Sequence, residues 1–230
     1  MNNSIKKALL AFAAALALPA AMASQITFDP AAPNIYAGGE GFDEAGYKLN
    51  VVPPLGGVDG GLNGAVVSNA ASCVVLDCPV GNSTQYFLGL NDGGLKVSKS
   101  DGLGFRLFGF DASFVAPVVA NIPFSVARIV IFGHDVFDNE YWTSFTLPGQ
   151  NANGYWEFSN FVFDATDTWF RDVTFLACLT DESGQCVADG QNQAQFALDN
   201  VNLVPEPTSW ALLGISLAAM LVAARRKRQF

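Results

Sequence analysis

The chain has 230 residues, of which 50% are hydrophobic and 14% are charged, and its net charge is −9. Half of its twelve basic residues lie in the two chain ends, so residues 24–204 keep six basic and twenty acidic residues, a net charge of −14. Such an acidic surface repels phosphate backbones and argues against nucleic acid as a partner. It favours cations such as calcium, or serves solubility alone.

Residues 1–23 have the three parts of a secretory signal peptide. Lys6 and Lys7 form a basic start, residues 8–18 form an apolar run, and Ala21-Met22-Ala23 is an A-x-A site. The apolar run has no polar face, which argues against a buried amphipathic helix. We therefore expect signal peptidase to cut after Ala23 and the rest of the chain to be exported.

The body of the chain, residues 24–203, shows almost only β signals. Short apolar stretches are separated by Gly, Asn, Asp and Pro, and no run has a helical period. The predicted strands are Gln25–Asp29, Gly46–Val52, Gln85–Leu90, Leu95–Ser100, Phe105–Val115, Val126–Phe132, Tyr141–Leu147, Tyr155–Phe163, Trp169–Leu179 and Gln195–Leu203. Regular short strands without helices predict an all-β fold, a single β-sandwich of jelly-roll type.

Three local patterns refine this prediction. Leu55–Asn69 is rich in glycine and is predicted to be a long loop. Asn91-Asp92-Gly93-Gly94 predicts a hairpin between the strands on either side of it. In the strand Phe105–Val115, strict alternation puts Phe108 and Phe110 on one face and Leu107 on the other.

All four cysteines, Cys73, Cys78, Cys178 and Cys186, lie in the body. An even number in an exported chain predicts two disulfides. Three pairings are possible, and 73–78 with 178–186 is favoured because each pair is close in sequence. Asp181-Glu182-Ser183-Gly184 reads as a turn, which suits a hairpin stapled by the second pair. A zinc site would want histidines, and His134 is the only one.

The C-terminal tail has three parts in a fixed order. Val204-Pro205-Glu206-Pro207 is held extended by its prolines. Residues 210–224 carry no charge and would span about 22 Å as a helix, against about 30 Å of hydrocarbon. Arg225-Arg226-Lys227-Arg228 follows at once and is expected to stay in the cytoplasm. The tail is therefore predicted to be a short membrane segment with the body outside.

This tail resembles the PEP-CTERM sorting signal of Gram-negative bacteria. The resemblance implies transient anchoring in the inner membrane, recognition by an exosortase, and cleavage at or near Pro205-Glu206-Pro207. The body would then reach the cell surface or the extracellular matrix, often in bacteria that make exopolysaccharide. The alternative is an ordinary C-terminal anchor with a proline-rich stalk.

The body is also similar to PEP-CTERM ectodomains. The resemblance rests on Ile26–Asp29, Asp43–Tyr47, Tyr86–Leu90 and Phe196–Val201, and Gln195-Phe196-Ala197-Leu198-Asp199 matches a Q-F-x-x-D group among them. It implies a galactose-binding-like jelly roll and carries over no catalytic residue.

Asp199 lies in an apolar strand, on a face that alternation assigns to Ala197, Val201 and Leu203. A buried carboxylate needs a cation or several hydrogen-bond donors. In jelly-roll carbohydrate modules the first and last strands are neighbours, and an acid on the last strand commonly binds calcium. One interpretation is therefore a structural calcium between Asp199 and Asp29. The others are that Asp199 accepts backbone N–H bonds or faces solvent.

Two further groups of residues are candidates for metal binding, catalysis or sugar binding. His134–Glu140 holds one imidazole and three carboxylates, which reads as a metal loop, an acid–base pair or an ordinary polar turn. Exposed aromatics can stack on sugars, whereas buried ones build the core. The candidates are Tyr141, Trp142, Tyr155, Trp156 and Trp169.

The sequence contains no G-x-S-x-G motif, and Asp164, Asp167 and Asp172 read as turn and strand-end acids. The chain is thus expected to be an exported, non-catalytic binding or structural protein associated with surface polysaccharide. The alternative is a secreted enzyme that cuts polysaccharide with carboxylates on a sheet face.

Overall fold

The computed structural model describes residues 23–54, 61–68, 73, 76–116, 125–164, 167–187 and 193–206. Within these ranges the chain forms thirteen strands and no helix, so none that could cross a membrane. Ala23–Val204 is one compact unit. The predicted signal peptide up to residue 22 and the tail from Pro207, including Arg225–Arg228, lie outside the described residues.

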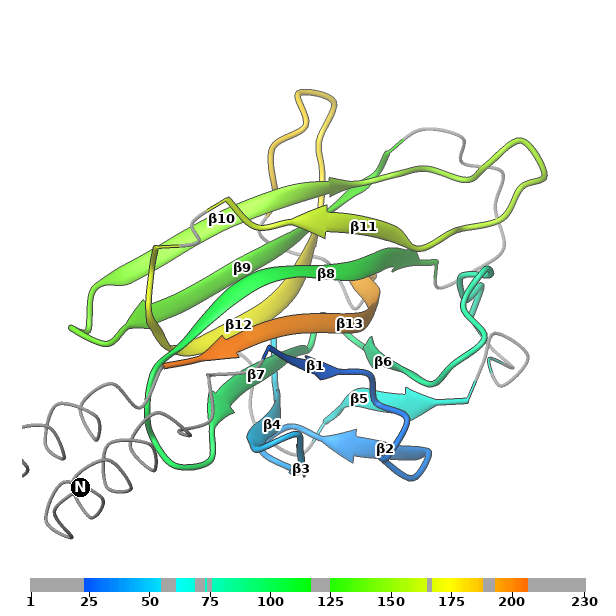
Figure 1. Cartoon of the computed structure of the whole chain (residues 1–230). Coiled ribbons are helices and arrows are strands. Elements are labelled where there is room, and N and C mark those ends of the chain that lie inside the picture. Colours follow the sequence, from blue (N-terminus) through cyan, green and yellow to red (C-terminus); the bar gives the residue numbers. More distant parts are fainter. Residues whose placement is uncertain are drawn as a thin grey trace, which may run out of the picture. The chain divides into compact units, whose positions relative to one another are not determined.

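The strands form two layers (Figure 1). The first layer has the order β2 (Asn34–Ala37), β5 (Leu62–Val67), β6 (Tyr86–Gly89), β13 (Gln195–Pro205) and β8 (Phe105–Val115), with β1 (Ser24–Ile26) on β13 and β11 (Ser159–Val162) on β8. The second has the order β10 (Glu140–Leu147), β9 (Ala127–Asp135), β12 (Phe170–Leu179), β7 (Gly94–Lys99), β4 (Tyr47–Val52) and β3 (Gly41–Glu44). Phe105 of β8 pairs with Phe170 of β12, and this is the pair that connects the layers. The predicted all-β sandwich is confirmed.

An aromatic core fills the space between the layers. Phe110 illustrates it, because its ring lies 5.3–5.6 Å from the rings of Phe145, Phe161 and Phe175, which come from three different strands. Edge-to-face and offset pairs at such distances add to the free energy gained by burying the rings. Many of the chain's phenylalanines are therefore structural.

The alternation predicted for β8 is wrong. Leu107 and Phe110 both lie in the core, whereas Phe108 is 37% exposed. The inward side of the strand therefore changes between Leu107 and Phe110. Gly109 lies at this change, and a Cβ there would come within 2.6 Å of the Phe161 carbonyl oxygen. A glycine permits the close approach of β11 at this point.

A second change of face occurs in β13. Asn200 has a left-handed φ of 51°, which interrupts the alternation. Val201 and Leu203 therefore point into the main core with Leu198, while Asp199 lies on the opposite, outward side. The prediction that Asp199 shares a face with Val201 and Leu203 is wrong for this reason.

The predicted hairpin at residues 91–94 is also wrong. Asn91 and Asp92 have φ values of 51° and 59°, as the primed turn requires. However, β6 pairs with β5 and β13 in the first layer, whereas β7 pairs with β4 and β12 in the second. The turn is therefore a corner between the layers.

The region predicted as a long loop, Leu55–Asn69, contains the strand β5. β2 and β3 were not predicted either. All three are short, and two have glycine among their residues, which weakens the strand signal. Pairing determines them instead, because β3 pairs with β4, β5 pairs with β6, and β2 pairs with β5.

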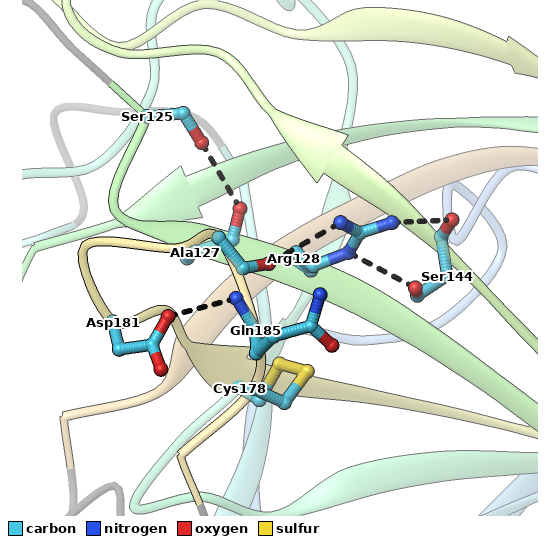
Figure 2. The surroundings of a disulfide bond; sticks show 9 residues. Ser125, Ala127, Arg128, Ser144, Cys178, Asp181 and Gln185 are labelled. Atoms are coloured by element: carbon cyan, nitrogen blue, oxygen red, sulfur yellow. Dashed lines mark hydrogen bonds between the residues drawn. A yellow bond between two sulfur atoms is a disulfide. The ribbon is translucent and has the colours of Figure 1, made fainter.

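Both favoured disulfides are present, Cys73–Cys78 and Cys178–Cys186. The second closes the predicted hairpin, in which the Gln185 backbone N–H donates to the Asp181 carboxylate (Figure 2). The Asp181 N–H in turn donates to the Gln185 carbonyl. Arg128 on β9 donates to the Ser144 hydroxyl at 3.0 Å and to the Gly184 carbonyl at 3.4 Å (Figure 2). The stapled hairpin is thus attached to the second layer.

The first disulfide belongs to a loop over the outside of the first layer. Cys78 packs with Tyr86, Leu88, Val115 and Ala197 in a second, smaller hydrophobic cluster. This cluster explains why outward residues of the first layer are buried.

Candidate functional site

The outward side of the second layer presents two adjacent rows of side chains. Directly opposite residues on neighbouring strands share a face, about 5 Å apart. The first row is Trp142, Phe132, Thr174, Lys96 and Asn50. The second row is Glu140, His134, Asp172, Ser98 and Lys48. We call this surface the Trp142 face.

Trp142 is the dominant exposed group on this face, with 68% of its surface accessible. Phe132 lies directly opposite it on β9 and is half-buried. The Phe132 ring also contacts the His134 ring edge-to-face at 5.1 Å. The exposed Trp142 indole therefore lies beside an aromatic pair on the neighbouring strand.

Asp172 is the buried centre of the second row, with 4% exposure. Its Oδ1 lies 3.1 Å from His134 Nδ1 and 3.4 Å from Lys96 Nζ, and Arg171 Nε lies 3.3 Å from its Oδ2. Burial raises the pKa of Asp172, but the His134 hydrogen bond and the Lys96 and Arg171 charges outweigh it and leave the pKa below its usual value. Asp172 is thus an ionised anchor that positions Lys96 and His134.

This arrangement can bind a ligand that is apolar on one side and rich in hydroxyls. The indole of Trp142 offers a flat ring and one N–H donor, and Lys96 has donors left beyond its contact with Asp172. Asn50 and Glu140 are exposed and provide acceptors. A stacking ring beside donors and acceptors is a small-molecule recognition pattern.

The other predicted aromatics divide between surface and core. Trp156 is 1% exposed and packs on Phe114, and Tyr141 packs on Phe163 and Phe170. Trp169 lies under the Arg106 guanidinium, 4.3 Å from its carbon. Tyr155 is 51% exposed, in the loop between β10 and β11. Trp142 and Tyr155 therefore have the accessible rings that stacking needs.

His134–Glu140 does not form a metal loop in this structure. His134 and Asp135 end β9, Glu140 begins β10, and the Asp135 carboxylate accepts the backbone N–H groups of Phe137 and Asn139 at 2.8 Å. Across the described ranges, no three His, Cys, Asp or Glu side chains are grouped to hold a metal. The segment is a polar turn next to the Trp142 face.

Asp199 is fully buried on the outer side of the first layer. Its Oδ2 accepts from Asn82 Nδ2 at 2.7 Å and its Oδ1 from the Asn200 N–H at 2.7 Å. The Thr84 hydroxyl, 3.1 Å away, is shared with the Asn82 amide oxygen. Burial, together with the nearby Asp29 charge, raises the pKa of Asp199 to about 6 against these hydrogen bonds.

One loop donates hydrogen bonds to both Asp29 and Asp199. The Gln85 N–H donates to Asp29 Oδ1 at 3.0 Å, while Asn82 of the same loop donates to Asp199. A calcium ion bridging the two acids would have to displace these donors. The geometry therefore favours the hydrogen-bonded interpretation, and calcium binding stays a competing prediction.

The Asp199 carboxyl group should make the stability of the body depend on pH. Its folded pKa of about 6 lies above the ordinary value, so the folded state holds the proton more tightly. Its contribution is fully present below about pH 4 and is lost as the pH rises through about 6, an effect of up to about 3 kcal/mol. We expect Asp199→Asn to abolish this part of the pH dependence, measured by urea unfolding between about pH 4 and about pH 8.

The control is Asp167→Asn, which alters an exposed acid and should preserve the wild-type pH profile. The same titration with a calcium chelator tests the competing prediction. A chelator-dependent loss of stability in the wild type, absent from Asp199→Asn, would establish calcium and contradict the hydrogen-bonded interpretation.

The last strand leads directly into the tail. β13 ends at Pro205, and Leu203, which is 1% exposed, pairs with Ser24 of β1. Residues 203–228 match the PEP-CTERM protein-sorting motif. The chain carries a PEP-CTERM sorting motif. The motif marks an exported protein that is sorted to the cell surface and processed by exosortase, and here its first residues belong to a folded strand.

Three solved structures with a similar fold are of carbohydrate-binding modules. TmCBM61 in complex with β-1,4-galactotriose is 11% identical, with a TM-score of 0.35, over 70% of this chain and 90% of that one. The CBM22-1 xylan-binding domain of Paenibacillus barcinonensis Xyn10C is 10% identical, with a TM-score of 0.37, over 82% and 97%. The CBM22-1–GH10 modules of Clostridium thermocellum Xyn10B are 12% identical, with a TM-score of 0.37, over 80% and 28%. No curated protein matches the chain.

Sequence reasoning missed three contributors to the Trp142 face, namely Phe132, Lys96 and Asp172. The sequence predicts that Asp172 is a turn or strand-end acid, whereas it lies inside β12. The sequence pattern could have indicated part of this, because alternation in β9 and β7 puts Phe132, His134 and Lys96 on the polar side of their strands. The sequence pattern does not give the order of the strands across the sheet, and that order brings the residues together.

Proposed function

We propose that the body, residues 24–203, is a non-catalytic module that binds surface or matrix polysaccharide through the Trp142 face. The observation that carries this proposal is the 68% exposure of Trp142 beside Phe132 on a sheet face with polar groups around it. Exposed apolar patches that are rimmed by polar residues mark interaction sites. Aromatic rings of this kind supply much of the binding energy in interfaces.

The chemistry of the face favours a sugar over other partners. Pyranose rings have apolar C–H faces that stack on indole, and hydroxyls that pair with donors and acceptors. Along the two rows, Lys96 lies one strand from Asn50 and two strands from His134. The net charge of −14 on the body argues against nucleic acid.

Export supports the same proposal. Signal peptidase would release Ser24, and exosortase would cut near Val204-Pro205-Glu206-Pro207 once the apolar segment had entered the inner membrane of a Gram-negative bacterium. The body would then be displayed at the cell surface or released into the matrix, where polysaccharide is the abundant ligand.

A binding role is preferred over catalysis because of where the acids with raised pKa lie. A general acid at neutral pH needs a raised pKa and access to the substrate. In the described part of the chain, burial raises the pKa of Glu44 and Asp199, but both are buried and already accept hydrogen bonds. Asp172 on the Trp142 face has a lowered pKa and is held ionised.

A glycan array paired with a reducing-sugar assay tests the proposal. We expect the mature body to be retained on one class of polysaccharide without releasing new reducing ends. Release of reducing ends would establish the enzyme alternative, and failure to bind any surface polysaccharide of the producing bacterium would contradict the proposal.

A further inference from the structure

Three exposed apolar side chains lie in two turns of the body. Phe137 is 82% exposed and Val136 is 40% exposed, in the turn between β9 and β10. Leu103 is 46% exposed, in the turn between β7 and β8. We call these three residues the apolar tip. None belongs to the Trp142 face.

The two turns meet at one end of the sandwich. Phe105, which follows Leu103 by two residues, pairs with Phe170, and Phe170 pairs with Asp135 at the end of β9. The Val136 backbone N–H donates to the Trp169 carbonyl at 2.9 Å. The apolar tip is therefore formed where β8 and β12 begin and β9 ends.

The chain leaves the body at this same end. β13 is next to β8 and runs in the opposite direction (Figure 1). Asn200 Nδ2 donates to Asp111 Oδ2 at 2.8 Å, so residues after Asn200 lie beside residues before Asp111. Pro205, the last residue of β13, is thus near the start of β8 and the apolar tip.

The connection from this exit to the apolar tail segment is short. Only Glu206–Ser209 separate Pro205 from Trp210, the first residue of the uncharged run. Fully extended, this connection reaches at most about 18 Å. Before processing, the exit end of the body must therefore stay close to any bilayer that holds residues 210–224.

Two acids beside the apolar tip are paired with basic side chains. Arg171 Nη1 lies 2.8 Å from Asp138 Oδ1, and Lys99 forms an ion pair with Asp101. These pairs offset two of the negative charges near Phe137 and Leu103, whereas the Asp135 carboxylate, which accepts the Phe137 N–H, stays negatively charged in the same turn. Exposed aromatic and aliphatic side chains on loops insert into the interfacial region of a bilayer.

We propose that the apolar tip contacts the phospholipid surface while the chain is anchored. In this orientation the end of the body that contains Pro205 faces the bilayer. The proposal rests on the proposed function in one respect, the insertion of residues 210–224 into a membrane. Three side chains give weak binding alone, but the covalent tether supplies a high local concentration of lipid. The orientation presents Val204-Pro205-Glu206-Pro207 at the bilayer, where a membrane-embedded protease works.

The test uses the uncut chain, residues 24–230, in vesicles of phosphatidylethanolamine and phosphatidylglycerol that contain no exosortase. A photoreactive benzoylphenylalanine replaces Phe137, and in the control protein it replaces Tyr155. Tyr155 is also exposed, but its loop lies at the other end, where Val80 pairs with Glu157 and Asp77 with Ala116 just beyond β8. Lipid adducts are measured by mass spectrometry after irradiation.

We expect adducts at position 137 to exceed those at position 155 about tenfold. Flotation of the same vesicles separates the two proposals. If the chain floats but position 137 gives no more adducts than position 155, the proposed contact between the apolar tip and lipid is wrong. A protein partner would then be the alternative ligand of the apolar tip. If the chain does not float, membrane anchoring by the tail is wrong.

Discussion

Replacing Trp142 by alanine should weaken polysaccharide binding about thirtyfold, equivalent to about 2 kcal/mol. The physical reason is the loss of the stacking ring at the end of the row that contains Phe132 and Lys96. Because 68% of Trp142 is exposed, its removal costs the fold little, and the stability should change by less than about 0.5 kcal/mol. Affinity electrophoresis or calorimetry with the polysaccharide found on the array measures the change.

The matched control for Trp142→Ala is Tyr155→Ala. Tyr155 is 51% exposed, in the loop after β10 and away from the Trp142 face. Its removal should leave binding unchanged. Equal losses in the two variants would mean that exposed aromatics bind without a defined site. Normal binding by Trp142→Ala would remove the Trp142 face from the proposal.

Replacing Phe110 by alanine should lower the free energy of unfolding by about 3–5 kcal/mol. Phe110 is fully buried and contacts Phe145, Phe161 and Phe175, so alanine would leave a cavity that three strands border. Relaxation around such a cavity is limited because the neighbouring rings belong to different strands. Urea unfolding with the disulfides intact measures the loss.

Phe108→Ala is the matched control, two positions away on the same strand. Phe108 is 37% exposed, and its removal should cost less than about 1 kcal/mol. Strict alternation would put Phe108 and Phe110 on the same face and predict similar losses. Similar measured losses would therefore contradict the change of face at Gly109.

The disulfides and the long strands were predicted correctly because neighbouring residues determine them. Cys73–Cys78 and Cys178–Cys186 are close in sequence, and the turn Asp181–Gly184 brings the second pair together without help from the rest of the fold. The long apolar strands, such as β12, were found for a similar reason, since their own composition favours extended chain.

The direction in which side chains point was predicted less well. A period of two assigns faces only while the strand is regular, and one extra residue reverses every later assignment. This happened in β8 near Gly109 and in β13 at Asn200. The error at Asn200 moved Asp199 from an apolar face to a hydrogen-bonded site under the loop of Asn82.

By itself, the sequence determined the destination of this protein, its all-β character and its two disulfides, because contiguous motifs, composition and short-range spacing carry that information. The tertiary structure alone decided which side chains meet. Asp172 lies 38 residues from His134, and Lys96 comes from a third strand. Strand order across the second layer brings them together beside Trp142, and strand order depends on the packing of the whole core rather than on any local pattern.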